Sequence, residues 1–253
     1  MENMSETVNK ALDLLELFLD GDGELNLAEL ASLSGYNKAT AYRLVSTLAR
    51  RGYIHQRERK GAYSLGFKTL DFTCAIRKNF KFIDIAYLYL SKLSKARNIS
   101  AYLAILDSDS SLVIEEIALV ETMRINSPIG KRMPLYATAS GRVLLASLTG
   151  AERDAYYRRN TLRPLTAKTI TEPAELEKEI EKIQREGVAL SEEDYKNGLM
   201  SVAAPLYNGN QDIIAAAGII APVAQFDDCG RDKLTAELKS CTAEISQVIS
   251  RIG

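Results

Sequence analysis

Residues 26–51 read NLAELASLSGYNKATAYRLVSTLARR, and this stretch decides the fold of the first part of the chain. Asn26 followed by Glu29 has nearly the spacing of a capping box, which predicts that a short helix begins here. The residues Ser34-Gly35-Tyr36 end that helix after two turns, and a second helix is predicted over residues 37–51. Two helices joined by a short turn that contains glycine are typical of a helix-turn-helix.

The flanking segments complete a small domain. Upstream, apolar residues at helical spacing predict a helix over residues 8–19. Downstream, residues 53–56 and 62–65 predict two short strands that are joined by a charged turn. A hairpin with a basic tip behind the second helix is the wing of a winged helix-turn-helix. We therefore expect this domain to cover residues 1–65.

Charge is distributed unevenly within this domain. Residues 36–61 contain seven basic residues and one acid, a net charge of +6, whereas residues 8–30 have a net charge of −5. Basic charge alone would fit the solvated surface of any small helical domain. Because these charges fall on the second helix and on the hairpin tip, DNA binding is favoured, since cationic side chains that displace counterions supply most non-specific affinity for DNA.

Candidate contacts with DNA come from three places: the turn, the second helix and the hairpin tip. Side chains near the start of the second helix are expected to reach base edges or phosphates in the major groove, and those of the tip a backbone or the minor groove. Tyr42 could equally pack on its own domain. The predicted DNA-binding residues are Ser34, Lys38, Thr40, Tyr42, Arg43, Thr47, Arg57, Arg59 and Lys60.

Composition excludes several other classes of protein. The chain has 253 residues, with 32 Lys and Arg against 33 Asp and Glu. Its three cysteines lie far apart and it has one histidine, His55, so a disulfide framework and a multi-histidine or cysteine-rich metal site are excluded. We expect no metal and no cofactor.

The amino-terminal residues do not resemble a signal peptide. The longest apolar stretch, residues 213–224, is shorter than the ~18 residues that a membrane span needs. We therefore expect a cytoplasmic protein with no membrane partner.

The rest of the chain predicts a linker helix and a larger domain. Residues 66–79 predict a helix whose apolar face either pairs with a partner chain or packs on a neighbouring domain, and Cys74 is expected to be buried. Residues 80–253 combine predicted hairpin strands with flanking helices, which indicates an α+β fold with a mostly antiparallel sheet.

This larger domain has the features of a binding module rather than of an enzyme. It contains no histidine, no phosphate-binding loop and no nucleophile elbow, and the adjacent acids Glu192-Glu193-Asp194 are expected to form a solvated turn. A helix capped by Thr138 or Ser140 offers free amides and a positive dipole end to a carboxylate. An ordinary capped helix is the alternative.

The whole chain resembles the IclR family of bacterial transcription regulators. The motifs that carry the resemblance are VNKALDLLELF, LNLAELASLSGYNKATAYRLVSTLARRGYI and YSLG in the first domain, and IGKRMPLYATASGRVLLA and VALSEEDYKNGLMSVAAPLYNGNQDIIAAAGIIAP in the second. The resemblance implies a winged helix-turn-helix, a linker helix and a GAF-like effector-binding domain. It also implies homodimers or dimers of dimers on palindromic double-stranded operators, and a small organic acid as the signal.

The resemblance further implies where the effector binds. The backbone donors, the opposite wall and the floor of this candidate effector site would come from Ala139, Ser140, Gly141, Ser191, Asp194, Leu199, Ser201, Gly218 and Ile220. Members that bind very small keto acids often have serines at the last two positions. Their loss here removes donors and adds apolar surface, so we expect a larger or more apolar acid, with an aromatic acid as one candidate.

The sequence therefore predicts a sequence-specific DNA-binding regulator, a repressor rather than an activator, that a small organic acid modulates. Two alternatives stay open. One is a sensor or scaffold that acts through protein contacts, and the other, less favoured, is an enzyme with a helix-turn-helix appendage.

Overall fold

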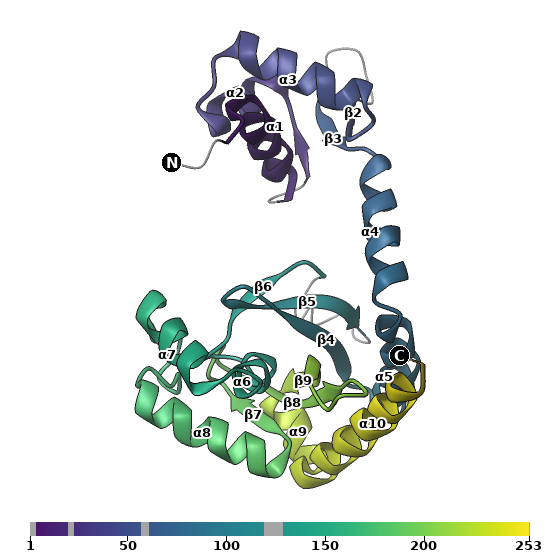
Figure 1. The fold of residues 1–253 in the computed structure, drawn as a ribbon, viewed down its shortest axis with the longest axis vertical. Helices are drawn as coiled ribbons and strands as arrows, with labels where there is room; N and C mark the ends of the chain where they lie inside the picture. The colour runs from purple at the N-terminus through teal and green to yellow at the C-terminus, as the bar shows by residue number, and fades with distance from the viewer. Residues whose placement is uncertain (1–3, 20–22, 57–60, 119–128, 253) are drawn as a thin grey trace. The chain divides into compact units, whose positions relative to one another are not determined.

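The computed structural model describes residues 4–19, 23–56, 61–118 and 129–252. The chain divides into two compact units, Met1–Phe80 and Lys81–Gly253 (Figure 1). The first unit is mostly helical and the second combines one antiparallel sheet with helices, so the α+β fold is confirmed. Among the described residues, no helix is both long enough and apolar enough to cross a membrane.

Three helices form the core of the first unit. Leu14, Leu30 and Val45, one from each helix, are fully buried against one another and against Ile54. The second of these helices begins and ends where the sequence predicts. Asn26 makes a complete capping box with Glu29 at its start, and Gly35 takes the left-handed conformation, with a φ of 69°, at its end. The helical elements of this unit are α1 (Glu6–Glu16), the short 3-10 helix η1 (Leu17–Leu19), α2 (Leu27–Ser34), α3 (Lys38–Arg50) and α4 (Lys68–Asn79).

A small sheet covers these helices. The expected hairpin is formed by β2 (Ile54–Gln56) and β3 (Tyr63–Leu65). A third strand, β1 (Glu24–Leu25), pairs with the other edge of β3 and was not predicted from the sequence. With two residues, this strand is too short to show an alternating pattern.

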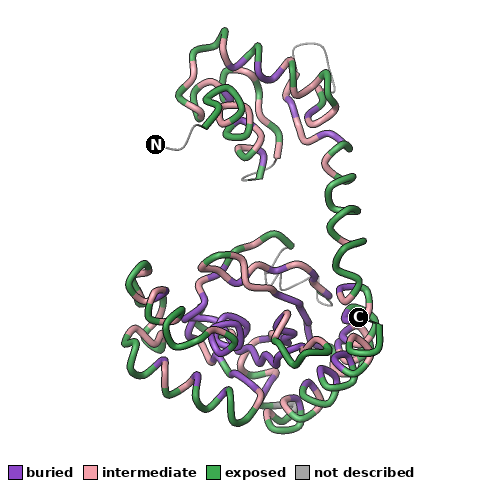
Figure 2. Tube along the Cα trace, viewed as in Figure 1, coloured by how far each residue is buried: buried purple, intermediate pink, exposed green. Residues whose placement is uncertain are grey.

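Helix α4 differs from the other helices because none of its residues is buried (Figure 2). Two rings contact the rest of the first unit: Phe72 stacks on Tyr53 with 6.0 Å between centroids, and Phe67, just before the helix, stacks on His55. Cys74 is exposed, so the expectation that it is buried is wrong. The helix presents its apolar side chains to solvent rather than to a core.

The second unit is built on a six-stranded antiparallel sheet with the order β6-β5-β4-β9-β8-β7. Strands β6 and β7, at the two edges, are short and were missed in the sequence. The strands are β4 (Ser100–Asp107), β5 (Ser110–Ile117), β6 (Arg132–Pro134), β7 (Ala189–Glu192), β8 (Leu199–Tyr207) and β9 (Ile213–Pro222).

Helices cover both faces of this sheet. On one face, α5 and α10 pack on a core that includes Leu90, Leu103 and Leu238. On the other face, α6 and α8 pack over Ala203 and Ala216. The helices of this unit are α5 (Phe82–Arg97), α6 (Ala139–Ala146), α7 (Gly150–Arg159), α8 (Pro173–Glu186), α9 (Val223–Cys229) and α10 (Arg231–Ile252).

Alternation along the strands decides which side chains face α6. On β8 and β9, small residues such as Ser201, Ala203 and Gly218 face α6, whereas their sequence neighbours belong to the opposite core. Helix α6 is buried along its whole length (Figure 2). The small side chains of the sheet let this helix approach closely, and they place its amino terminus against the strands.

Candidate functional site

The turn between α2 and α3 is held by its own side chains. Ser34 donates its hydroxyl proton to the carbonyl of Leu30 at 2.6 Å, and its oxygen accepts from the amide of Tyr36 at 3.3 Å. Asn37 caps α3 by accepting from the amide of Thr40 at 2.9 Å. The turn therefore has a defined conformation, and the Ser34 hydroxyl is already committed to it.

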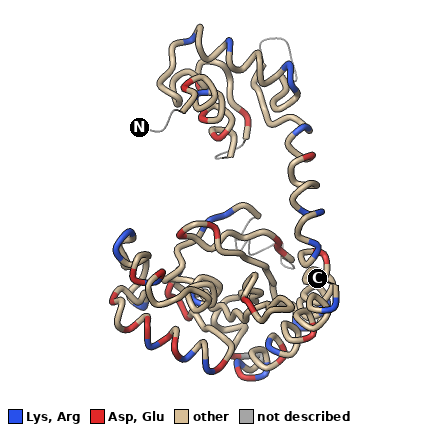
Figure 3. The backbone as a smooth tube through the Cα atoms, viewed as in Figure 1, with Lys and Arg blue, Asp and Glu red and all other residues tan. Residues whose placement is uncertain are grey.

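Helix α3 presents a basic and polar face. Lys38, Tyr42, Arg43 and Thr47 are exposed, and Thr40 is half-buried at the edge of this face. The helix carries no Asp or Glu (Figure 3). A shallow hollow along it is lined by Tyr42, Arg43, Ser46, Thr47, Arg50 and Arg51.

Three residues of this hollow, Ser46, Arg50 and Arg51, were not among the predicted DNA contacts. Their spacing could have found them, because residues three and four apart share one face of a helix. Ser46 lies three positions after Arg43, and Arg50 lies four positions after Ser46.

The predicted wing contacts Arg57, Arg59 and Lys60 lie outside the described residues. At the base of this hairpin, the side-chain amide of Gln56 donates to the carbonyl of Gly61 at 2.7 Å and so joins its two sides.

The amino terminus of α6 was predicted to supply free backbone donors. Thr138 is the cap, because its hydroxyl oxygen accepts from the amide of Gly141 at 3.1 Å. Gly141 has a packing role, since a Cβ there would lie 2.3 Å from the carbonyl oxygen of Leu135. The Gly141 amide is thus engaged within the protein, whereas Ser140 points toward the sheet.

Ser140 belongs to a group of buried hydroxyls that we call the hydroxyl cluster: Tyr102, Ser111, Ser140 and Ser201. The hydroxyl oxygens of Ser111 and Ser140 are 3.0 Å apart. Burial raises the pKa of the Tyr102 phenol, and hydrogen bonds to Ser140 and Ser201 oppose that rise. Tyr102 was not among the effector residues predicted from the sequence.

Strand pairing brings several of the predicted effector residues together. Ser201 on β8 lies between Ser191 on β7 and Ile220 on β9, all in one cross-strand row. In a neighbouring row, Gly218 lies directly opposite Tyr102. Ala139 is fully buried at the start of α6, and Leu199 lies at the end of β8, opposite Pro222.

The structure corrects one step of the sequence interpretation. Gly218 was expected to leave extra apolar surface at the floor of the site. A Cβ at Gly218 would lie 2.4 Å from Cζ and 2.5 Å from Oη of Tyr102. The tyrosine therefore occupies this space and brings a hydroxyl with it.

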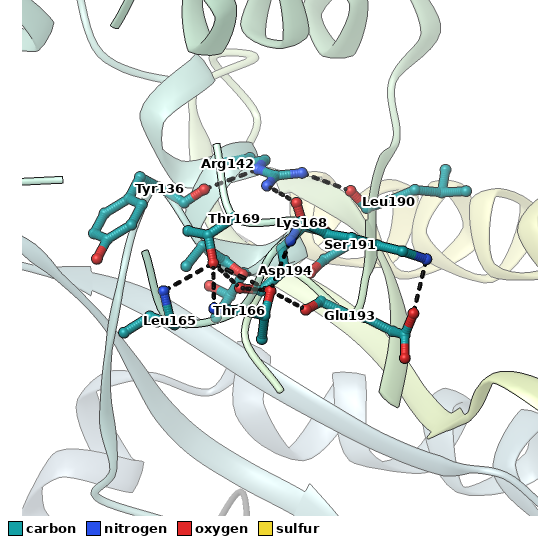
Figure 4. Close-up of polar contacts among 12 residues, drawn as sticks. Tyr136, Arg142, Leu165, Thr166, Lys168, Thr169, Leu190, Ser191, Glu193 and Asp194 are labelled. Atoms are coloured by element: carbon teal, nitrogen blue, oxygen red, sulfur yellow. Dashed lines mark hydrogen bonds and ion pairs between the residues drawn. The ribbon is translucent and has the colours of Figure 1, made fainter. Parts of the chain in front are cut away.

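Asp194 takes part in a buried ion pair (Figure 4). Arg142 on α6 donates from Nη2 to Oδ1 of Asp194 at 2.5 Å, and both side chains are buried. The same guanidinium donates to the carbonyls of Tyr136, at 2.9 Å, and Leu190, at 3.0 Å. Arg142 was missed in the sequence, although a basic residue in the first turn of an otherwise apolar helix is a signal for a buried partner.

The turn that follows β7 is fastened by further polar contacts. Thr166 and Thr169 donate to the carbonyls of Glu193, at 2.7 Å, and Asp194, at 2.6 Å (Figure 4). Lys168 pairs with the neighbouring acids Glu192 and Glu193. A solvated acidic turn, as expected from sequence, is therefore wrong for Asp194. This carboxylate fixes β7 and its turn to α6.

Comparison with known proteins identifies the class. Residues 7–58 match the IclR helix-turn-helix domain, and residues 74–247 match the bacterial transcriptional regulator IclR C-terminal domain. The chain belongs to the IclR family. Its IclR-family homologues are DNA-binding transcriptional regulators and repressors.

Two curated relatives of this IclR-family chain show how far the similarity extends. The HTH-type transcriptional regulator KipR of Bacillus subtilis is 32% identical, over 98% of this chain and 99% of its own length. The transcriptional repressor IclR of Escherichia coli is 24% identical, over 88% of this chain and 82% of its own length.

Solved structures of the family share the fold. The crystal structure of the Thermotoga maritima IclR superimposes with a TM-score of 0.82 at 26% identity, covering 96% of this chain and 98% of that one. An IclR homologue from Microbacterium hydrocarbonoxydans, complexed with 4-hydroxybenzoate, superimposes with a TM-score of 0.88 at 18% identity, covering 98% of this chain and 100% of that one. At such low identity, the second match concerns the fold alone.

Proposed function

We propose that this IclR-family regulator represses transcription from an operator that its winged helix-turn-helix binds, and that a small organic acid bound to its larger domain changes the affinity for that operator. In this proposal residues 1–65 bind DNA, residues 66–79 link the domains and residues 80–253 sense the effector. The protein acts in the cytoplasm and catalyses no reaction. An aromatic acid is the effector to test first.

One observation carries the DNA-binding part of the proposal: the exposed face of α3. Lys38, Arg43 and Arg50 project from a helix without acids, behind a turn that is fixed by capping. Such a helix is suited to the major groove, where arginine and lysine read guanine edges and neutralise phosphates. A protein-binding scaffold would not need this uniform sign of charge.

We propose that the chain binds a palindromic operator as a homodimer or as a dimer of dimers. The exposed apolar side chains of α4, among them Leu70, Phe72 and Ile76, support this proposal because burying them against a second copy would remove apolar area from water. A symmetric dimer places two recognition helices on half-sites that are about one helical turn apart, or a multiple of that.

The test is the binding of purified protein to its own upstream DNA, followed by fluorescence anisotropy at several salt concentrations. We expect Arg43→Ala to reduce the preference for operator over unrelated DNA. Arg59→Ala should weaken binding to all DNA sequences alike and reduce the slope of log affinity against log salt concentration by about one. Lys78→Ala, a charge loss on α4, is the matched control.

Three outcomes would contradict the proposal. Equal affinity of the wild type for operator and unrelated DNA would exclude sequence-specific regulation. Absence of any DNA binding would favour the protein-contact scaffold. Turnover of an added acid would favour the enzyme with a helix-turn-helix appendage.

A further inference from the structure

Tyr102 and Gly218 form a matched pair across strands β4 and β9. They are directly opposite in the register, and the Tyr102 side chain is 2% exposed. A Cβ on Gly218 would lie 2.4 Å from Cζ of the tyrosine, far inside van der Waals contact. An aromatic ring that covers a cross-strand glycine is a known way to fill the gap that the glycine leaves. A side chain at position 218 would therefore require the Tyr102 ring to move.

The Tyr102 hydroxyl stands where the effector was expected to find its donors. It lies over Gly218 on β9, 2.5 Å from the position that a Cβ there would take, next to the strand that carries Ser201. Burial raises the pKa of this phenol, and hydrogen bonding with Ser140 and Ser201 opposes that rise, so at neutral pH the hydroxyl is protonated and can donate.

The hydroxyl cluster borders an apolar wall. Val113 and Met133 are buried against the Tyr102 ring, and Tyr195 and Ile220 are partly buried against the same group. The Lys131 ammonium lies 5.5 Å from the centroid of the Tyr195 ring. The hydroxyl cluster and the amino terminus of α6 thus adjoin aromatic and aliphatic side chains, and Lys131 places a positive charge next to Tyr195.

We propose that Tyr102 determines the specificity of the candidate effector site: its hydroxyl, together with Ser140 and Ser201, binds the carboxylate of an aromatic monocarboxylic acid, while the ring of the acid packs on Met133 and Tyr195. This inference rests on the proposed function and deepens it. Hydrogen bonds to an ionised carboxylate are about twice as strong as neutral ones, so the donors favour an acid over its amide or ester. The apolar wall favours a ring over a two-carbon chain.

The first experiment measures binding of benzoate and of pyruvate to the full-length protein by calorimetry. The wild type should bind benzoate more tightly than pyruvate. Tyr102→Phe keeps the ring over Gly218 and removes one charge-assisted hydrogen bond, so its affinity for benzoate should fall by roughly 10- to 100-fold. Tyr207→Phe is the matched control, because Tyr207 is a partly buried tyrosine on β8 outside the hydroxyl cluster, and it should bind benzoate as the wild type does.

The second experiment tests the Tyr102–Gly218 pair without a ligand. Gly218→Ala should lower the melting temperature of the wild type, and the same change in a Tyr102→Ala background should lower it much less, because the clash is then absent. Equal losses in both backgrounds would overturn the pairing of these residues.

The remaining outcomes separate this inference from the proposed function. If Tyr102→Phe binds benzoate as tightly as the wild type, the role of Tyr102 is wrong and the proposed function stands. If Tyr102→Ala binds benzoate more tightly, the phenol blocks the site and the inference is overturned. If the wild type binds neither acid, the inference falls together with the effector part of the proposed function, while operator binding still tests the rest.

Discussion

At the residue scale, the carboxylate of Asp194 has a structural role, because it is the charged partner of the buried Arg142. Arg142 is 2% exposed, and its guanidinium has three protein acceptors, of which only Asp194 is charged. Removing one partner of such a pair leaves the other buried without a counter-charge.

We predict that Asp194→Asn lowers the free energy of unfolding of the second unit by about 3 to 5 kcal/mol. The loss is measured by urea unfolding followed by circular dichroism. Glu193→Gln is the control, because this neighbouring carboxylate pairs with the exposed Lys168 and its loss should cost much less. Equal losses for the two variants would show that burial does not decide the cost.

The buried phenol of Tyr156 should make the free energy of unfolding depend on pH in the alkaline range. Burial raises the pKa of this phenol to about 12, whereas an unfolded tyrosine ionises near pH 10. Below pH 10 the phenol is neutral in both states, so its full contribution is present. Between pH 10 and about 12 only the unfolded state ionises, and stability is lost as the pH rises.

Melting temperatures measured across this pH range test the prediction for Tyr156. The Tyr156→Phe variant should lose less stability than the wild type, by roughly 2 to 3 kcal/mol at the alkaline end. Parallel losses in both proteins would mean that other groups govern alkaline unfolding.

At the element scale, α6 depends on one glycine to lie close to the chain that precedes it. A Cβ at Gly141 would lie 2.3 Å from the Leu135 carbonyl oxygen, which is backbone and cannot move freely. We predict that Gly141→Ala lowers the free energy of unfolding by about 1 to 3 kcal/mol through overpacking.

Gly150, in the first turn of α7, provides the matched comparison. Nothing lies within 4 Å of the position that its Cβ would take. Gly150→Ala should therefore be neutral or stabilise by up to about 1 kcal/mol, since alanine restricts the unfolded chain. Thermal unfolding of both variants gives the contrast, and a destabilised Gly150→Ala would refute the steric explanation.

Elements that depend on local signals were predictable from the sequence, and those that depend on pairing were not. The cap at Asn26 and the turn at Gly35 both follow from neighbouring residues. The Tyr102–Gly218 pair joins strands that are more than a hundred residues apart, and a single sequence contains no signal for their register. For Arg142 the sequence signals burial with a partner but not which partner, because Asp194 follows in a distant turn.

The two edge strands of the second unit and the bounds of its last helix could not be predicted from the spacing of apolar residues. Strand β6 has three residues and β7 four, which is too few for alternation to distinguish them from loops. At the end of the chain, the flanking helix is divided at Gly230, which separates α9 from α10.

At the scale of the whole molecule, charge and binding chemistry are separated between the two units. The formal net charge of −1 conceals the basic stretch of residues 36–61, while the hydroxyl cluster of the second unit is uncharged. DNA affinity should accordingly fall steeply with salt, whereas affinity for an acid that hydroxyls hold should fall much less. DNA binding can therefore be measured at low salt, and acid binding at a salt concentration that suppresses DNA binding.

Regulation by an effector requires that these two reactions are coupled, and the coupling must be reciprocal. If benzoate changes the dissociation constant for operator DNA by some factor, operator DNA must change the dissociation constant for benzoate by the same factor, because both describe one thermodynamic cycle. We predict a common factor on the order of 5 to 150, measured by anisotropy for DNA and by calorimetry for benzoate at one salt concentration. Tyr102→Phe should weaken benzoate binding without changing operator affinity in the absence of benzoate. Unequal factors would mean that benzoate acts through a third equilibrium, such as the association of dimers, and not on the DNA-bound conformation alone.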